Sequence, residues 1–228
     1  MPSQRHEFVQ PIVVCVDKER PAPALDAIRA VADASVKMYA RDMVGYDSLD
    51  ETERLAVRHI ARAWSSWLNG PIAKTVRRAD RATYERLVGS TSLTEATIVT
   101  RGDAEAIAFR PMMADELPNN LRRLQVSGTQ LPEGTPTKVL TPTASILLNA
   151  DLDMSTGKAA AQAAHALFTW FLNTDESPEP DAIECDVSFV SGKELEDIVA
   201  SRGVRDAIHD AGRTEIEPGS LTAIAVTD

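Results

Sequence analysis

The sequence predicts an α/β protein built from two halves of similar organisation. Short apolar runs of strand length alternate with longer stretches of helical periodicity along the 228 residues. Turn-forming residues separate these runs, and a segment rich in Thr, Pro and Gly lies between the halves. With 43% hydrophobic and 25% charged residues, the composition is that of a globular chain with one large domain or two small ones.

The first half, residues 1–125, is interpreted as one α/β domain. Strands are expected at 11–16, 72–79, 96–100 and 105–109, helices at 24–40, 51–68 and 80–88, a loop at 111–118, and a short helix or turn at 116–124. Asp50 is expected to cap the second helix, and Asn69, Gly70 and Pro71 to end it. The turn at 101–103 joins the last two strands as a hairpin.

The second half, residues 146–228, follows a predicted linker at 126–145. A short strand at 146–148 leads through turn-forming residues to a long helix at 158–172, which Ser155 or Thr156 is expected to cap. A strand at 183–190, a helix at 193–200, a short strand at 204–209 and a final strand at 221–226 complete this domain.

Charge and cysteine usage exclude several classes of function. The formal net charge of −10 argues against indiscriminate nucleic-acid binding. Cys15 and Cys185 lie in or beside strand-like runs, so both are expected to be buried, reduced thiols. No apolar segment begins the chain and no stretch reaches the length of a membrane helix, so we expect a cytoplasmic protein without a signal peptide.

The two halves repeat the same order of predicted elements. The segments IAKTVRRADRATYERLV and IECDVSFVSGKELEDIV align without a gap, and GDAEAIAF resembles PGSLTAIAV in the corresponding place. We interpret the first half as a degenerate copy of the second, and chance recurrence of α/β units is the alternative. Different strand orders in the two halves would contradict a duplication. The expected assembly is a homodimer or an internal pseudo-dimer.

The long helix of the second half carries the first group of candidate site residues. Lys158, Gln162 and His165 share one helical face. A lysine in the first turn is unusual, because the helix dipole already makes that end positive. Beside backbone N–H groups, this lysine forms a site for an anion or a developing negative charge.

A loop and the strand that follows it carry the second group, which consists of Asp210, Arg213, Thr214 and Thr222. Loops of this kind meet at the strand ends of an α/β sheet, where sites usually form. A carboxylate beside a lysine and hydroxyl groups suits the activation of water. No G-x-S-x-G nucleophile motif and no metal-spaced His/Cys cluster occurs.

Several of these residues have structural alternatives. Asp210 is also suited to capping a turn, and Gln162 to bonding a neighbouring helix. His165 fits a packed core position better than an acid or base. Arg213 is as well suited to pairing with Asp210 or Glu215 as to binding phosphate.

The segment DLDMSTGKAAAQAAHA followed by DAGRTEIEPGSLTAIAV resembles the type 2 peptidyl-tRNA hydrolases over about residues 145–226. The resemblance implies a compact α/β domain whose mixed four-stranded sheet is flanked by helices. It also implies hydrolysis of the ester that joins a peptide to the 3′ end of tRNA, with no metal or organic cofactor. The alternative is a non-catalytic RNA- or protein-binding module that retains the fold.

Residue by residue, the resemblance implies Lys158, Asp210 and Thr214 as catalytic residues. The implied substrate-binding residues are Gln162, His165, Arg213 and Thr222. The substrate that this assignment implies is peptidyl-tRNA.

The region 146–228 is distinctly acidic, which is unfavourable for holding a phosphate backbone. Basic residues gather instead in the first half: Arg54, Arg58, Arg62, Lys74, Arg77, Arg78, Arg81 and Arg86. We therefore expect the first half to supply tRNA contacts, including Arg77 and Arg78, with a merely solvated face as the alternative. The nearby His59, Trp64 and Trp67 are expected to pack in the core.

Overall fold

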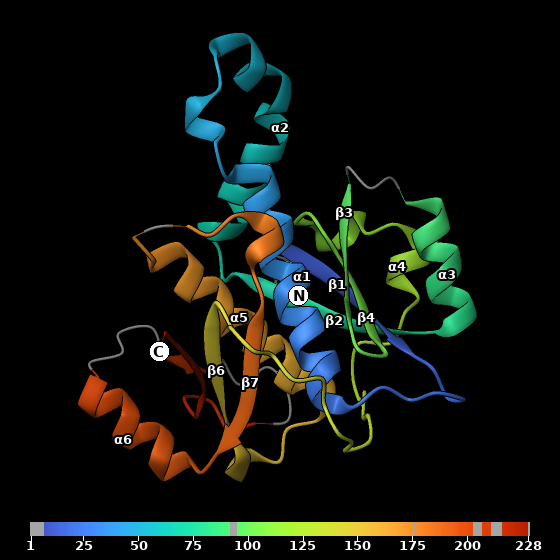
Figure 1. Cartoon of the computed structure of the whole chain (residues 1–228). Helices are drawn as coiled ribbons and strands as arrows, with labels where there is room; N and C mark the ends of the chain where they lie inside the picture. Colours follow the sequence, from blue (N-terminus) through green and yellow to red (C-terminus); the bar gives the residue numbers. More distant parts are fainter. Residues whose placement is uncertain (1–6, 92–94, 176, 203–206, 211–215, 228) are drawn as a thin grey trace, which may run out of the picture.

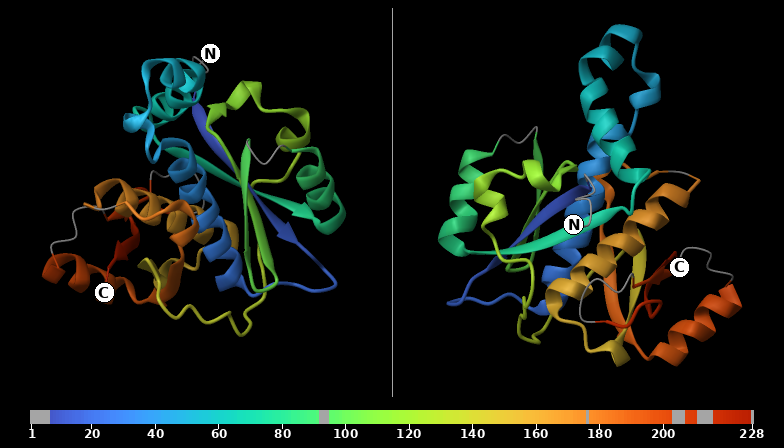
Figure 2. Two further views of the ribbon diagram at one scale, coloured as in Figure 1. Left: turned by 45° about the horizontal axis from the view of Figure 1, so that its top comes forward. Right: turned by 180° about the vertical axis from the view of Figure 1, so that it is seen from behind.

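Two β-sheets lie on either side of a central pair of helices, α1 (Ala24–Met43) and α5 (Thr156–Asn173) (Figure 1). The computed structural model describes residues 7–91, 95–175, 177–202, 207–210 and 216–227. The helices α3 (Arg81–Ser90) and α4 (Asn119–Arg122) cover the outer side of the first sheet, and α6 (Gly192–Arg202) lies beyond the second (Figures 1 and 2).

The first sheet belongs to the N-terminal half. Its strands are β1 (Phe8–Val16), β2 (Ala73–Asp80), β3 (Ala96–Arg101) and β4 (Ala104–Phe109), in the order β2-β1-β4-β3, with β5 (Met112–Met113) paired to β1. Only β1 and β2 run parallel among these pairs. The strand β5 and a 3₁₀ turn at Ala114–Glu116 occupy the segment that we expected to be a loop, because Phe8 and Val9 extend β1 far enough to pair with it.

The second sheet repeats this arrangement. Its strands are β6 (Ala144–Asn149), β7 (Cys185–Val190), β8 (Ile208–His209) and β9 (Leu221–Val226), in the order β7-β6-β9-β8. The pair β6–β7 is parallel, and β6–β9 and β8–β9 are antiparallel. The predicted α/β class, the mixed four-stranded sheet and the repeated layout are thereby confirmed, and the halves share one strand order, as a duplication requires.

Registers in the two sheets identify equivalent positions. Ile12 pairs with Val76 and Ala108, and Ile146 pairs with Val187 and Ala225. The ungapped alignment places Val76 on Val187 and therefore Lys74 on Cys185. Counted from the first residue of each central helix, Asp26 corresponds to Lys158 and Asp33 to His165.

One hydrophobic core joins the two halves. It contains the inner faces of both sheets and the alanine-rich sides of α1 and α5, which small side chains allow to pack closely. Trp64 and Trp67 are buried in it, as predicted; the ring of Trp64 stacks on Phe168, and that of Trp67 meets Phe168 edge-on. A second cluster, beneath α3 and α4, covers the outer face of the first sheet. Cys15 and Cys185 are buried and free, as predicted.

Local signals position the helix α2 (Glu51–Leu68), which projects from the body of the molecule (Figure 1). Asp50 and Glu53 form a reciprocal capping box at its start. Because only Trp64 and Trp67 of this helix are buried, His59 is exposed, and its predicted place in the core is wrong. A 3₁₀ turn at Tyr46–Ser48 precedes α2, and two others occur at Ala150–Leu152 and Pro180–Ala182.

The segment 126–145 packs against both central helices. The Pro132 carbonyl accepts a hydrogen bond from the N–H of Ala24 (2.9 Å), and the Thr129 carbonyl accepts one from the N–H of Gly157 (3.1 Å). Thr129 and Leu131 are buried. Within the described residues, no helix has both the length and the apolar character needed to cross a membrane.

Candidate active site

The N-terminus of α5 positions the predicted lysine. Ser155 caps the helix, and its hydroxyl accepts a hydrogen bond from the N–H of Lys158 (3.3 Å). Gly157 allows the 126–145 segment to approach, since a Cβ at this position would lie 3.1 Å from the Thr129 Cβ. The Ser155 cap and the 126–145 segment therefore both hold the first turn of α5, and they fix the backbone position of Lys158.

Lys158 forms an ion pair with Asp210, the predicted carboxylate. The side chains retain only 12% and 2% of their accessible surface, respectively, so the pair is largely removed from water. The backbone of Asp210 is held against the turn that precedes β9. Its N–H donates to the Ser220 carbonyl (2.9 Å), and its carbonyl accepts from the N–H of Gly219 (2.8 Å).

Gln162 and Thr222 complete a buried chain of hydrogen bonds to the same carboxylate. The Gln162 amide nitrogen donates to Asp210 Oδ2 (3.1 Å). Because a carboxylate only accepts, the amide oxygen must face the other way, where the Thr222 hydroxyl lies 3.0 Å from it. That hydroxyl is also 2.9 Å from the Ile208 carbonyl. Gln162 thus bonds to Asp210 rather than to a neighbouring helix.

His165 lies further along α5 and meets a residue of the other half. Lys74 Nζ is 3.5 Å from His165 Nδ1, and it lies 4.6 Å and 4.7 Å from the ring centroids of Trp67 and Phe168. Burial, reinforced by the positive charges of Lys74 and Lys158, holds the pKa of His165 well below its usual value. His165 is therefore neutral at neutral pH and contacts Lys74, not Asp210.

Burial also lowers the pKa of Lys74 well below its usual value. In the sequence, Lys74 stands out only as one of the basic residues of the first half. No local signal marks it as a neighbour of α5, because the contact spans 91 residues and depends on how the halves pack.

The predicted residues Arg213 and Thr214 lie outside the described residues. Within the described parts of the chain, no group of three or more His, Cys, Asp or Glu side chains is arranged to hold a metal ion.

The equivalent place in the first half holds a different network. Asp26, at the position of Lys158, accepts hydrogen bonds from the Thr137 N–H and hydroxyl (3.0 Å each). Arg29 pairs with Asp26 and Asp186, and Arg101 pairs with Asp33. The charged groups of this network pair with one another, and among the described residues only Arg29 Nε of these side chains is buried without a hydrogen-bond partner, so the network ties the linker and the halves together.

The basic residues of the first half differ in accessibility. Arg77 is 7% exposed and donates to the carbonyls of Leu121 and Leu124 (3.2 Å each), so its expected contact with tRNA is wrong. Arg81 pairs with Asp17 and Glu105. Arg78 and Arg86 retain access to solvent.

Lys158, Gln162, Asp210 and Thr222 lie in a segment that is similar to known proteins. The family model of peptidyl-tRNA hydrolase PTH2 matches residues 143–227. Enzymes named peptidyl-tRNA hydrolase from Methanococcus maripaludis (strain C6), Methanocaldococcus jannaschii and Methanopyrus kandleri are 35%, 36% and 35% identical over 94, 94 and 92 residues. The matches cover 36% of this chain and 81%, 81% and 79% of the relatives. No solved structure matches the chain significantly.

Proposed function

The chain belongs to the peptidyl-tRNA hydrolase PTH2 family, and we propose that it hydrolyses the ester bond between peptide and tRNA in peptidyl-tRNA, releasing free tRNA. One observation carries the proposal: the buried Lys158–Asp210 pair, with Gln162 bonded to the same carboxylate, lies within the matched segment. This arrangement of a buried charge pair and a supporting amide favours catalysis over a binding module that merely retains the fold.

The chemistry follows from the two charges. A water molecule attacks the ester carbonyl carbon, and the Lys158 ammonium stabilises the oxyanion that develops on the carbonyl oxygen. Asp210 accepts the proton from the attacking water. The bond from carbon to the ribose oxygen then breaks, and that oxygen leaves with a proton as the 3′ hydroxyl of free tRNA.

The other side chains position this pair or the substrate. Gln162 holds the Asp210 carboxylate toward Lys158, and Thr222 fixes the orientation of the Gln162 amide. We assign Thr214 a catalytic role and Arg213 a contact with the substrate. His165, neutral and at the boundary of the halves, borders the site on the same face of α5.

We also propose a division of the chain in which residues 146–228 carry the reaction, 126–145 link the halves and 1–125 form a companion domain. The repeated strand order and the shared helical layer support an internal pseudo-dimer. A peptidyl-tRNA substrate implies a cytoplasmic location.

The test is turnover of a defined peptidyl-tRNA by the full chain, compared with Lys158→Ala and Asp210→Ala. We expect each variant to lose roughly 100-fold or more in kcat. The exposed residues Lys193 and Asp197 on α6 provide matched controls, Lys193→Ala and Asp197→Ala, which should retain full activity. An inactive intact protein, or full activity in both site variants, would end the proposal.

A further inference from the structure

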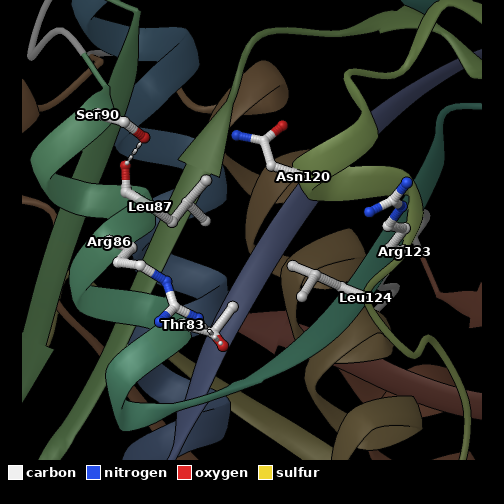
Figure 3. A pocket seen from close by; sticks show the side chains of 7 residues that line it. All are labelled: Thr83, Arg86, Leu87, Ser90, Asn120, Arg123 and Leu124. Carbon is white, nitrogen blue, oxygen red and sulfur yellow. Dashed lines mark hydrogen bonds between the residues drawn. The ribbon is translucent and has the colours of Figure 1, made fainter.

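A shallow hollow of about 330 Å³ lies between α3 and α4, on the outer side of the first sheet. Arg86 of α3 and Arg123 after α4 stand on opposite sides of it, and Leu124 lies between them (Figure 3). The hydroxyls of Thr83 and Ser90 also line it. The Ser90 hydroxyl donates to the Leu87 carbonyl (3.1 Å), so the two guanidinium groups at this open hollow are the groups that suit phosphate oxygens.

The distribution of charge along the chain means that a polyanionic substrate needs a basic surface in the first half. Residues 143–228 contain 5 Lys and Arg against 16 Asp and Glu, whereas residues 1–142 contain 19 against 18. A tRNA held only by the acidic segment would be repelled, so its phosphates need cations from the first half.

Most first-half arginines near the sheet are already engaged. Arg29, Arg81, Arg101 and Arg110 form ion pairs, and Arg77 is buried. Among the accessible arginines that form no ion pair within the described residues, four lie on β2, on α3 and at the end of α4: Arg78, Arg86, Arg122 and Arg123. We call these four residues the basic track.

The chain itself connects the basic track to the candidate active site. Arg78 pairs with Gln125 through a backbone hydrogen bond (2.9 Å), and its side chain donates to the Gly128 carbonyl (3.1 Å). The next residue, Thr129, accepts from the N–H of Gly157, beside Lys158. Thr129 lies six positions after Arg123, so their Cα atoms are at most about 20 Å apart.

We propose that the basic track binds the sugar–phosphate backbone of the tRNA whose 3′ end lies at Lys158. The inference rests on the proposed function and identifies where the rest of the substrate is held. A nucleic-acid duplex carries about one charge per 1.7 Å of axis, so a stem lying along these residues presents several phosphates to the four arginines. These arginine–phosphate contacts do not depend on the base sequence. They bind the tRNA without contacting the ester bond that is cleaved.

The experiment uses the full chain and the double variant Arg86→Glu/Arg123→Glu. Its matched control is Arg58→Glu/Arg62→Glu, which makes the same change in net charge on the exposed face of α2. Binding to deacylated tRNA is measured over a series of salt concentrations, and thermal unfolding verifies that both variants fold. We expect the track variant to weaken binding roughly tenfold or more and to lower the salt slope by about 1 to 2, and the control to change little.

A second readout separates this inference from the proposed function. Hydrolysis of a minimal 3′-aminoacyl-adenosine ester should be unaffected by the track variant, whereas kcat/KM for peptidyl-tRNA should fall with binding. Unchanged tRNA affinity, or an equal loss in the α2 control, overturns the basic track even if the enzyme is active. If the intact protein binds tRNA but cleaves neither substrate, the proposed hydrolase function is wrong. The binding data then still show whether the basic track binds tRNA.

Discussion

The backbone N–H of Cys185 donates a hydrogen bond to the Asp33 carboxylate, 3.0 Å away, at the place in α1 that His165 occupies in α5. Lys74, the counterpart of Cys185, contacts His165 through its side chain, with Nζ 3.5 Å from Nδ1. The rings of Tyr39 and Phe171, also equivalent positions, meet with centroids 6.0 Å apart. The halves therefore meet through equivalent positions whose chemistry differs.

Removing the partner of Asp33 should destabilise the protein strongly. Arg101 Nη2 lies 2.6 Å from Asp33 Oδ2, and Asp33 is fully buried, so its pKa is raised despite this arginine. Arg101→Met leaves a buried carboxyl group without its charge partner, and we expect a loss of about 3 kcal/mol or more in unfolding free energy. Denaturant unfolding measures this loss. The double variant Arg101→Met/Asp33→Asn should recover part of it; equal stability of the two variants would contradict the account.

Lys74 should make stability depend on pH in the alkaline range. Its pKa is lower in the folded chain than in the unfolded chain, so between those values the unfolded state binds more protons. The contribution of Lys74 to the unfolding free energy therefore increases as the pH rises toward 10.5 and decreases as the pH falls. Unfolding free energies at pH 7.5 and 9.5 should show a gain of at most about 1.4 kcal/mol per pH unit.

The variant Lys74→Met should abolish that gain, and Lys193→Met on the exposed face of α6 should retain it. The same change removes a positive charge beside His165 and should raise the pKa of that imidazole, observable by NMR titration. An unchanged His165 titration would show that the contact across the halves does not exist in solution.

Gly157→Ala should weaken the packing of the 126–145 segment against the first turn of α5. The added Cβ would meet the Thr129 Cβ at 3.1 Å and its hydroxyl at 3.4 Å, which forces one of the two to move. We expect a loss of about 1 to 3 kcal/mol in unfolding free energy. Gly89→Ala in α3 is the control, because nothing lies within 4 Å of its Cβ, and a gain of up to about 1 kcal/mol is expected there. Equal effects of the two substitutions would contradict the contact.

Features determined within a few residues were predictable from the sequence. The caps at Asp50 and Ser155 and the bounds of most helices depend on neighbours within one turn. Arg77 was not predictable, because adjacent residues of a strand point to opposite faces and only the fold reveals which face 119–124 covers. The contact between Lys74 and His165 was not predictable either, because it depends on how the two halves pack.

The candidate site divides in a similar way. Two motifs predicted Lys158, Gln162, Asp210 and Thr222 as its members, and the structure brings these four together. The order of hydrogen bonding among them was not predictable, since it depends on how β9 lies beside α5. The roles proposed for Arg213 and Thr214 remain predictions.

The hydrogen-bond chain from Thr222 through Gln162 to Asp210 should be visible as coupling in kinetics. Thr222→Val removes the donor to the Gln162 amide oxygen, and Gln162→Leu removes the donor to the carboxylate. Each should lower kcat roughly tenfold with little change in KM, because the charge pair is mispositioned rather than lost. Thr222→Ser, which keeps the hydroxyl, should retain most activity.

Among the described residues, hydrogen bonds through Gln162 join the Thr222 side chain to the Asp210 carboxylate, so the double variant should be no slower than Gln162→Leu alone. A double-mutant cycle on kcat measures this directly. Losses that multiply instead would mean that Thr222 acts on the reaction by a separate route, for example by contacting the substrate itself. In that case Thr222→Val should raise KM for peptidyl-tRNA, and the coupling energy between the two positions should be close to zero.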